Sequence, residues 1–227
     1  MSQDGKKEEI TNTKKLVDFV NMRVIKSVIS KSNSHKVISL IPINDHFESI
    51  DITSTKAIAW LKSSYYDVYG LIYSNETYKN ALDLFYSITI FSQETPEEPV
   101  FKRVAQTNDT IYYDLCNREW EAVKITKAKT EIVKLGPDTP MFLRTRRNRE
   151  QVKPSINPNV DALEQLIGIL KIPLSFQKLF KIHIVSFFLE GYPMPIMAIT
   201  GEQGSIKSTI TQSIKRIIDP SGDKFED

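Results

Sequence analysis

Apolar side chains recur with the spacing of an α-helix in the first part of the chain. Residues 13–31 carry one such pattern, which Ser32-Asn33-Ser34 ends. Ser54-Thr55 predicts the start of a second helix that ends at Gly70, and Ser74-Asn75-Glu76 predicts the start of a third. The second helix runs through Ala57, Ala59, Trp60, Leu61, Tyr65, Tyr66 and Tyr69. The third has Tyr78, Ala81, Leu82, Leu84, Phe85 and Ile88 on its inner face. We interpret these aromatic residues as core, and a stacking platform for bases is the alternative.

Shorter apolar stretches bounded by turn residues predict strands. Residues 36–43 form one, Asn44-Asp45 follows as a turn, and residues 47–52 return as another. Pro96 and Pro99 mark a boundary, beyond which two hairpins are predicted. The first joins residues 100–105 to 110–115, and the second joins 121–126 to 131–135.

Three further elements are predicted towards the end of the chain. Residues 160–170 and 175–189 predict two helices, and the apolar stretch 195–199 predicts a strand. This strand is apolar on both faces, which is typical of a central strand in a parallel sheet. A helix over 208–219 follows. Its expected buried side consists of Ile210, Ile214, Ile217 and Ile218.

The most informative motif lies between that strand and that helix. It reads Gly201, Glu202, Gln203, Gly204, Ser205, Ile206, Lys207, Ser208 and Thr209. Backbone N–H groups of such a loop, together with the positive end of the next helix, surround a phosphate. Lys207 is expected to reach the outer phosphates of ATP, and the Ser208 hydroxyl to bind Mg²⁺.

The loop departs from the usual G-x-x-x-x-G-K-[ST] pattern at one position. Ile206 stands where the second glycine belongs, although Gly204 supplies another flexible point. A β-branched residue is unfavourable at positive φ, so the backbone is expected to pass Ile206 at negative φ. The alternative interpretation is a glycine-containing turn before a helix.

The residues after Asp219 do not supply the acidic strand that a nucleotide-hydrolysing domain needs. We therefore expect this chain to be the N-terminal part of a longer protein, truncated soon after the phosphate loop. Alone it should hydrolyse little or no ATP. The predicted organisation is a disordered tail (residues 1–12) and helix within 1–35, an α+β module over 36–150, a linker at 151–158 and an ATPase start at 159–227.

Composition excludes several classes of protein. The chain has 227 residues, 41% hydrophobic and 26% charged, which is ordinary for a globular protein. A net charge of +2 does not by itself imply a nucleic-acid partner. Cys116 is the single cysteine, which excludes an internal disulfide and favours a cytoplasmic location. No signal peptide or membrane-spanning stretch is predicted, and the three histidines are too far apart to predict a zinc site.

The densest positive charge lies at Arg144, Arg146, Arg147 and Arg149. Two interpretations stay open for this cluster. It is either a solvated linker or a contact to nucleic-acid phosphates.

Several segments together resemble a known group, the ATP-binding, helicase-like proteins of bacteriophages and integrative elements, near the C-terminal halves of phage and plasmid primase–helicases. The matching segments are 41–46, 54–66, 99–105, 111–115, 120–125, 142–144, 163–170 and 199–209. The group usually has Gly or Ala at the position of Ile206. The resemblance implies ATP and Mg²⁺ as cofactors, DNA as a partner, a homo-oligomeric ring in the complete protein, and action in replication of a mobile element.

The fold class predicted is thus an α+β N-terminal module followed by the truncated start of an α/β P-loop NTPase domain of helicase-like (AAA+) type. The favoured function is ATP hydrolysis coupled to DNA remodelling when the protein is complete. One alternative is a non-hydrolysing DNA-binding or adaptor module with a remnant nucleotide site. Another is a different nucleotide-dependent protein, such as a kinase or a signalling switch.

Overall fold

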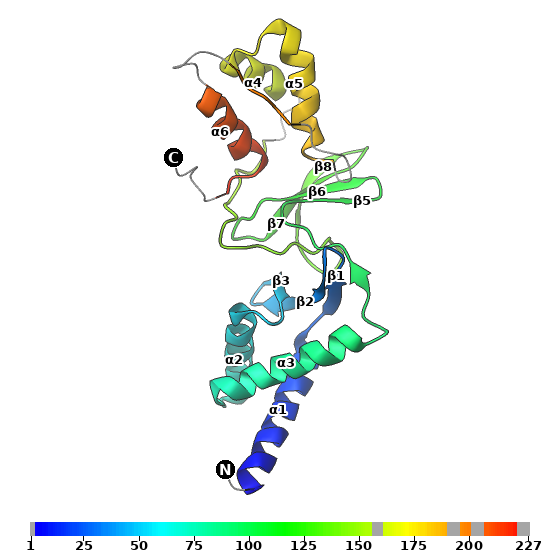
Figure 1. Cartoon of the computed structure of the whole chain (residues 1–227), viewed down its shortest axis with the longest axis vertical. Coiled ribbons are helices and arrows are strands. Elements are labelled where there is room, and N and C mark those ends of the chain that lie inside the picture. Colours follow the sequence, from blue (N-terminus) through cyan, green and yellow to red (C-terminus); the bar gives the residue numbers. More distant parts are fainter. Residues whose placement is uncertain (1–2, 156–160, 190–195, 201–206, 222–227) are drawn as a thin grey trace. The chain divides into compact units, whose positions relative to one another are not determined.

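A computed structural model describes residues 3–155, 161–189, 196–200 and 207–221. The chain divides into two compact units (Figure 1). Unit 1 consists of Met1–Phe101 with Leu135–Arg144, and unit 2 consists of Lys102–Lys134 with Thr145–Asp227. The described residues form two four-stranded sheets and six helices, so the predicted mixed α+β class is confirmed. The predicted domain boundaries at residues 36, 151 and 159 stay predictions.

Unit 1 combines three helices with one sheet. Its elements are α1 (Gln3–Arg23), β1 (Lys26–Ser30), β2 (Asn33–Ile43), β3 (His46–Asp51), α2 (Thr55–Tyr69), α3 (Asn75–Phe91) and β4 (Glu97–Glu98). The strand order is β3-β2-β1-β4, with antiparallel pairs except for the short parallel pair between β1 and β4. The predicted turn Asn44-Asp45 joins β2 to β3, and Asn44 has a φ of 50°.

Both faces of this sheet are covered, because side chains alternate along β2. Val37 and Ile41 point into a core shared with α1, α2 and α3. Ile38 and Leu40 point to the opposite face, where Met141 from the segment 135–144 packs on them. A strand buried on both faces needs the long apolar run that residues 36–43 provide.

The caps of α2 and α3 follow the sequence prediction. The Ser54 hydroxyl accepts a hydrogen bond from the Ala57 N–H at 3.2 Å, and Ser74 accepts one from Thr77 at 3.1 Å. Gly70 ends α2 in the left-handed conformation, with φ 66°, and its N–H donates to the Tyr66 carbonyl.

Several sequence predictions for unit 1 were wrong. The helix predicted over 13–31 ends at Arg23, and residues 26–30 form β1 instead. This segment pairs with β2, where its β-branched residues fit a sheet better than a helix. The tail predicted to be disordered belongs to α1 from Gln3 onward, since Lys and Glu favour helix despite their polarity. Leu84 and Ile88, predicted on the inner face of α3, are exposed.

The aromatic residues of α2 include both buried and exposed side chains. Trp60 and Tyr65 are buried as core residues, whereas Tyr66 and Tyr69 are about half exposed. The interpretation of these aromatics as core is therefore confirmed for the first pair and wrong for the second.

Unit 2 joins an antiparallel sheet to three helices. Its elements are β5 (Val104–Thr107), β6 (Thr110–Asp114), β7 (Glu121–Ile125), β8 (Thr130–Lys134), α4 (Ala162–Leu170), α5 (Leu174–Ser186) and α6 (Lys207–Ile218). The sheet is a meander in the order β5-β6-β7-β8, which confirms the pairing of both predicted hairpins. The first strand, predicted over 100–105, is displaced to Val104–Thr107. The three helices share a small core of Ile167, Leu170, Phe180, Ile184, Ile214 and Ile218.

The strand predicted over 195–199 is not found in its described residues. Residues 196–200 have no strand conformation, and the Ile196 side chain is 96% exposed. A central parallel strand needs hydrogen-bonding partners on both sides. In the described part of unit 2, every strand pairing is antiparallel and lies in the β5–β8 sheet or between Asn148 and Ser221.

Candidate phosphate-binding site

The start of α6 carries the described part of the predicted phosphate loop. Gly201, Glu202, Gln203, Gly204, Ser205 and Ile206 lie outside the described residues. Lys207 is the first residue of α6, and Ser208 and Thr209 follow in its first turn with exposed side chains. The first turn contains no acidic residue.

This helix terminus has the chemistry that an anion requires. The first N–H groups of an α-helix lack acceptors within the helix, and the helix dipole is positive there. A lysine and two hydroxyl groups add a cation and further donors. The backbone N–H groups that residues 201–206 would place around a phosphate remain a prediction.

The other end of α6 is held by side chains from the sheet and from the segment after residue 145. The Gln151 side-chain amide donates to the carbonyl oxygens of Arg216 and Ile217, at 3.0 and 2.9 Å. The Tyr113 hydroxyl donates to the Ile218 carbonyl at 2.9 Å. The last carbonyl groups of a helix receive no hydrogen bond from the helix itself. Here the Gln151 and Tyr113 side chains donate to them in place of water.

Arg103 binds the segment that leaves α6. Its guanidinium is 5% exposed, and its Nε donates to the Asp219 carboxylate at 3.0 Å. Two other nitrogens donate to the carbonyl oxygens of Asp114 and Arg149, at 3.0 and 2.9 Å. The guanidinium also lies over the Tyr113 ring, 5.7 Å from its centroid. One buried cation therefore contacts β6, the segment after residue 145 and the end of α6.

Burial changes the acidity of Tyr113. Desolvation raises the pKa of its hydroxyl above the ordinary value of 10.0, and the hydrogen bond from Gln151 and the nearby Arg103 charge oppose this rise. The hydroxyl is therefore a neutral donor to the Ile218 carbonyl near neutral pH.

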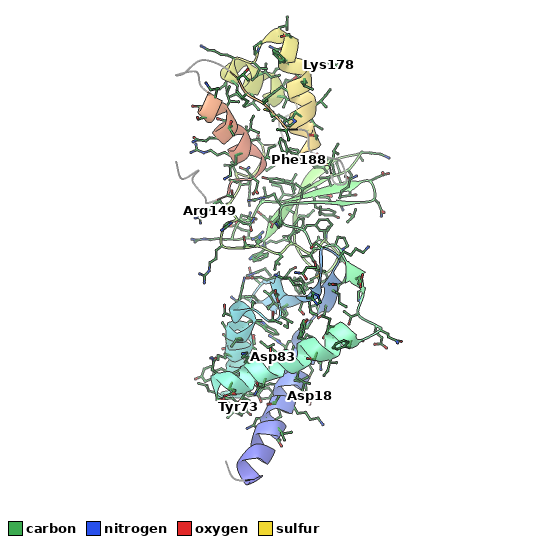
Figure 2. The ribbon with its side chains drawn as sticks, in the orientation of Figure 1. Asp18, Tyr73, Asp83, Arg149, Lys178 and Phe188 are labelled. Carbon is green, nitrogen blue, oxygen red and sulfur yellow. The ribbon has the colours of Figure 1, made fainter. Side chains whose placement is uncertain are left out.

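The arginine cluster lies mostly on a tight turn. The Asn148 side-chain oxygen accepts from the Thr145 N–H at 2.7 Å, and the Asn148 N–H donates to the Thr145 carbonyl at 3.2 Å. Arg146 and Arg147 occupy the tip of this turn, and both are exposed. Arg149 is also exposed, and Figure 2 shows it near the end of α6. We call Arg146, Arg147 and Arg149 the arginine turn; Arg144 belongs to unit 1.

Lys153, which follows the arginine turn, has an acidic partner. Its ammonium lies 2.6 Å from the Glu121 carboxylate. The hydrogen bond from Lys153 lowers the pKa of Glu121, and Asn117 also donates to that carboxylate. The ammonium of Lys153 is thus paired with a carboxylate of β7.

An apolar pocket lies between the sheet and the end of α6. Its volume is about 300 Å³, and Phe188, after α5, lines one side (Figure 2). The other lining residues are Tyr113, Leu115, Val123, Ile125, Gln151, Val152, Pro154 and Ile217. No local pattern in the sequence predicts this pocket, because its walls come from five separate segments of the chain.

The sequence also gave no signal for Arg103, Tyr113 or Gln151. Their partners at the end of α6 lie 116, 105 and 66 positions away. Long-range contacts of this kind leave no local pattern that periodicity or capping rules detect.

Within the described residues, no group of His, Cys, Asp or Glu is arranged to hold a metal ion. The role of Ser208 as a Mg²⁺ ligand is a separate matter and stays a prediction. The described helices also include none that is long and apolar enough to cross a membrane. No protein-family description, curated protein or solved structure matches this chain.

Proposed function

We propose that this chain binds the phosphates of Mg-ATP at the start of α6. In this proposal the backbone of residues 201–207 surrounds the β-phosphate, Lys207 stabilises the outer phosphates and the Ser208 hydroxyl binds Mg²⁺. The observation that carries the proposal is that Lys207, Ser208 and Thr209 open the described part of α6, directly after the glycine-containing sequence 201–206. Lys207 and the hydroxyl groups of Ser208 and Thr209 therefore lie together at the N-terminal end of the described helix, where the helix dipole favours an anion.

The wider proposal follows the resemblance to helicase-like proteins of mobile elements. Residues 159–227 would belong to an α/β P-loop ATPase domain, and residues 36–150 would form an attached α+β module. The protein would act as a ring and couple ATP hydrolysis to DNA remodelling in replication. Arg146, Arg147 and Arg149 would contact DNA phosphates, since they are exposed and close in sequence.

The test of nucleotide binding replaces Lys207. We expect Lys207→Ala to weaken binding of a fluorescent ATP analogue with Mg²⁺ by about tenfold or more, the usual effect of losing a charge-assisted hydrogen bond. Titrations followed by fluorescence measure the Kd of each variant.

Arg216→Ala is the matched control for this test. It removes the same charge from the last turn of the same helix, where Arg216 is exposed. Equal affinity of Lys207→Ala and wild type for the analogue would contradict the proposed site.

A non-hydrolysing DNA-binding or adaptor module is the second candidate. The absence of strand conformation in residues 196–200 favours it, because a P-loop normally follows a central strand. Under this candidate the protein binds DNA through the arginine turn, and ATP has no effect on its DNA affinity.

A further inference from the structure

The chain that leaves α6 runs beside the chain that leaves the arginine turn. The Arg149 N–H donates to the Pro220 carbonyl at 3.0 Å, and Asn148 pairs with Ser221 in an antiparallel bridge. The end of α6 and the arginine turn are therefore joined by backbone hydrogen bonds. A displacement of one moves the other.

Arg103 fixes this junction from inside the fold. Its side chain bonds the Asp219 carboxylate and the Arg149 carbonyl, and a third bond to Asp114 anchors it to β6. A guanidinium is planar and holds its donors at fixed angles, which an ammonium group does not do. Lysine at this position would keep the charge and lose the simultaneous contacts.

The helix α6 connects this junction to the proposed phosphate site. It spans 12 residues, a length of roughly 18 Å at 1.5 Å per residue. Phosphate would bind at its first turn, and Asp219 follows its last residue. A small shift or a change in mobility of the helix on phosphate binding thus reaches Asp219, Arg103 and Arg149.

We propose that Arg103 is a positioning residue that couples nucleotide binding at the start of α6 to the DNA affinity of the arginine turn. This inference rests on the proposed function of both sites. Coupling between binding sites is reciprocal, so DNA changes the nucleotide affinity by the same factor as nucleotide changes the DNA affinity. Such factors are typically about 5- to 150-fold.

The experiment measures three quantities on the full chain. These are the Kd for a fluorescent ATP analogue with Mg²⁺, the Kd for a fluorescein-labelled single-stranded oligothymidine, and the ratio of DNA Kd values with and without a saturating non-hydrolysable ATP analogue. In the wild type the ratio should differ from one by about fivefold or more. In Arg103→Lys it should fall close to one, while each separate Kd stays within about twofold of wild type, as expected when only the link is lost.

Lys102→Ala is the matched control, because Lys102 is the exposed neighbour of Arg103 and should keep the wild-type ratio. Circular dichroism checks the fold of each variant. If Arg103→Lys is unfolded, Asp219→Asn tests the same link from the half-exposed partner. A wild-type ratio in a folded Arg103→Lys or Asp219→Asn variant would overturn the coupling.

The separate titrations distinguish the two ways of failing. A wild-type chain that binds nucleotide and DNA with a ratio of one overturns the coupling and leaves the proposed function in place. A wild-type chain that does not bind the ATP analogue overturns the proposed function, and the coupling with it.

Discussion

At the scale of single residues, the end of α6 depends on donors from distant parts of the chain. Tyr113, Gln151 and Arg103 supply hydrogen bonds to carbonyl groups and a carboxylate that a helix end cannot satisfy internally. The Tyr113 hydroxyl is a donor that loses its proton at high pH. Its ionisation therefore reports on how α6 is held.

The Tyr113 pKa has a defined consequence for stability. Because burial raises the folded-state pKa above 10.0, ionisation is easier in the unfolded state. The contribution of the hydroxyl is complete below pH 10 and is lost as pH rises through the folded-state pKa. We expect Tyr113→Phe to be about 1 kcal/mol less stable than wild type near neutral pH, and the difference to shrink above pH 10.

Urea unfolding at several pH values measures this effect. Trp60→Phe as a background leaves Trp120, in unit 2, as the fluorescent reporter. Tyr112→Phe is the control. Tyr112 precedes Tyr113 on β6, so its side chain points to the opposite face of the sheet. A constant difference between wild type and Tyr113→Phe across this range would argue against a buried donor role.

At the scale of elements, helix boundaries were the most accurate predictions where capping residues are present. Ser54, Gly70 and Ser74 mark the ends of α2 and α3 in the structure as they do in the sequence. The end of α1 lacked such a signal, because residues 24–31 carry apolar residues that fit either a helix or a strand. Pairing with β2, a tertiary effect, decided for the strand.

Two glycines give opposite predictions for the same substitution. Gly70 has a φ of 66°, so Gly70→Ala should destabilise unit 1 by about 1 kcal/mol although no atom lies within 4 Å of an added Cβ. Gly168 lies within α4, without a positive φ and also with open space. Gly168→Ala should therefore stabilise unit 2 by about 0.5–1 kcal/mol.

Urea unfolding, followed by the tryptophan of each unit, measures both changes. The same sign for both substitutions would show that helical propensity and backbone conformation are not the deciding factors at these positions.

At the scale of the whole molecule, the two units interleave along the chain. The segment Leu135–Arg144 returns to unit 1 after the β5–β8 sheet has formed part of unit 2. There Met141 covers Val28, Ile38 and Leu40, and residues 101 and 142 form a parallel bridge. Unit 1 is therefore incomplete without residues that follow the sheet of unit 2.

This arrangement predicts a large effect of Met141→Ala on unit 1. Met141 is 5% exposed, so its truncation should cost about 2–5 kcal/mol, as for other large-to-small core changes. Met22→Ala is the control, because Met22 is 68% exposed at the end of α1 and should cost little. Urea unfolding in a Trp120→Phe background leaves Trp60 to report on unit 1, and an unchanged midpoint for Met141→Ala would contradict the role of this segment.

The sequence by itself determined the features that rest on local rules. Caps, turn residues and apolar periodicity predicted α2, α3, both hairpins of unit 2 and the helix that begins near Lys207. The predicted phosphate loop is likewise a local pattern, so its candidate residues can be named from the sequence, although 201–206 lie outside the described residues.

Tertiary structure alone decided the features that depend on distant partners. Residues 26–30 became a strand because β2 supplies hydrogen bonds, and residues 196–200 have no strand conformation because the described part of unit 2 supplies no parallel neighbour. The pairing of Arg103 with Asp219 spans 116 positions. A buried guanidinium finds its acceptors only when the chain has folded, and no spacing in the sequence specifies which acceptors these are.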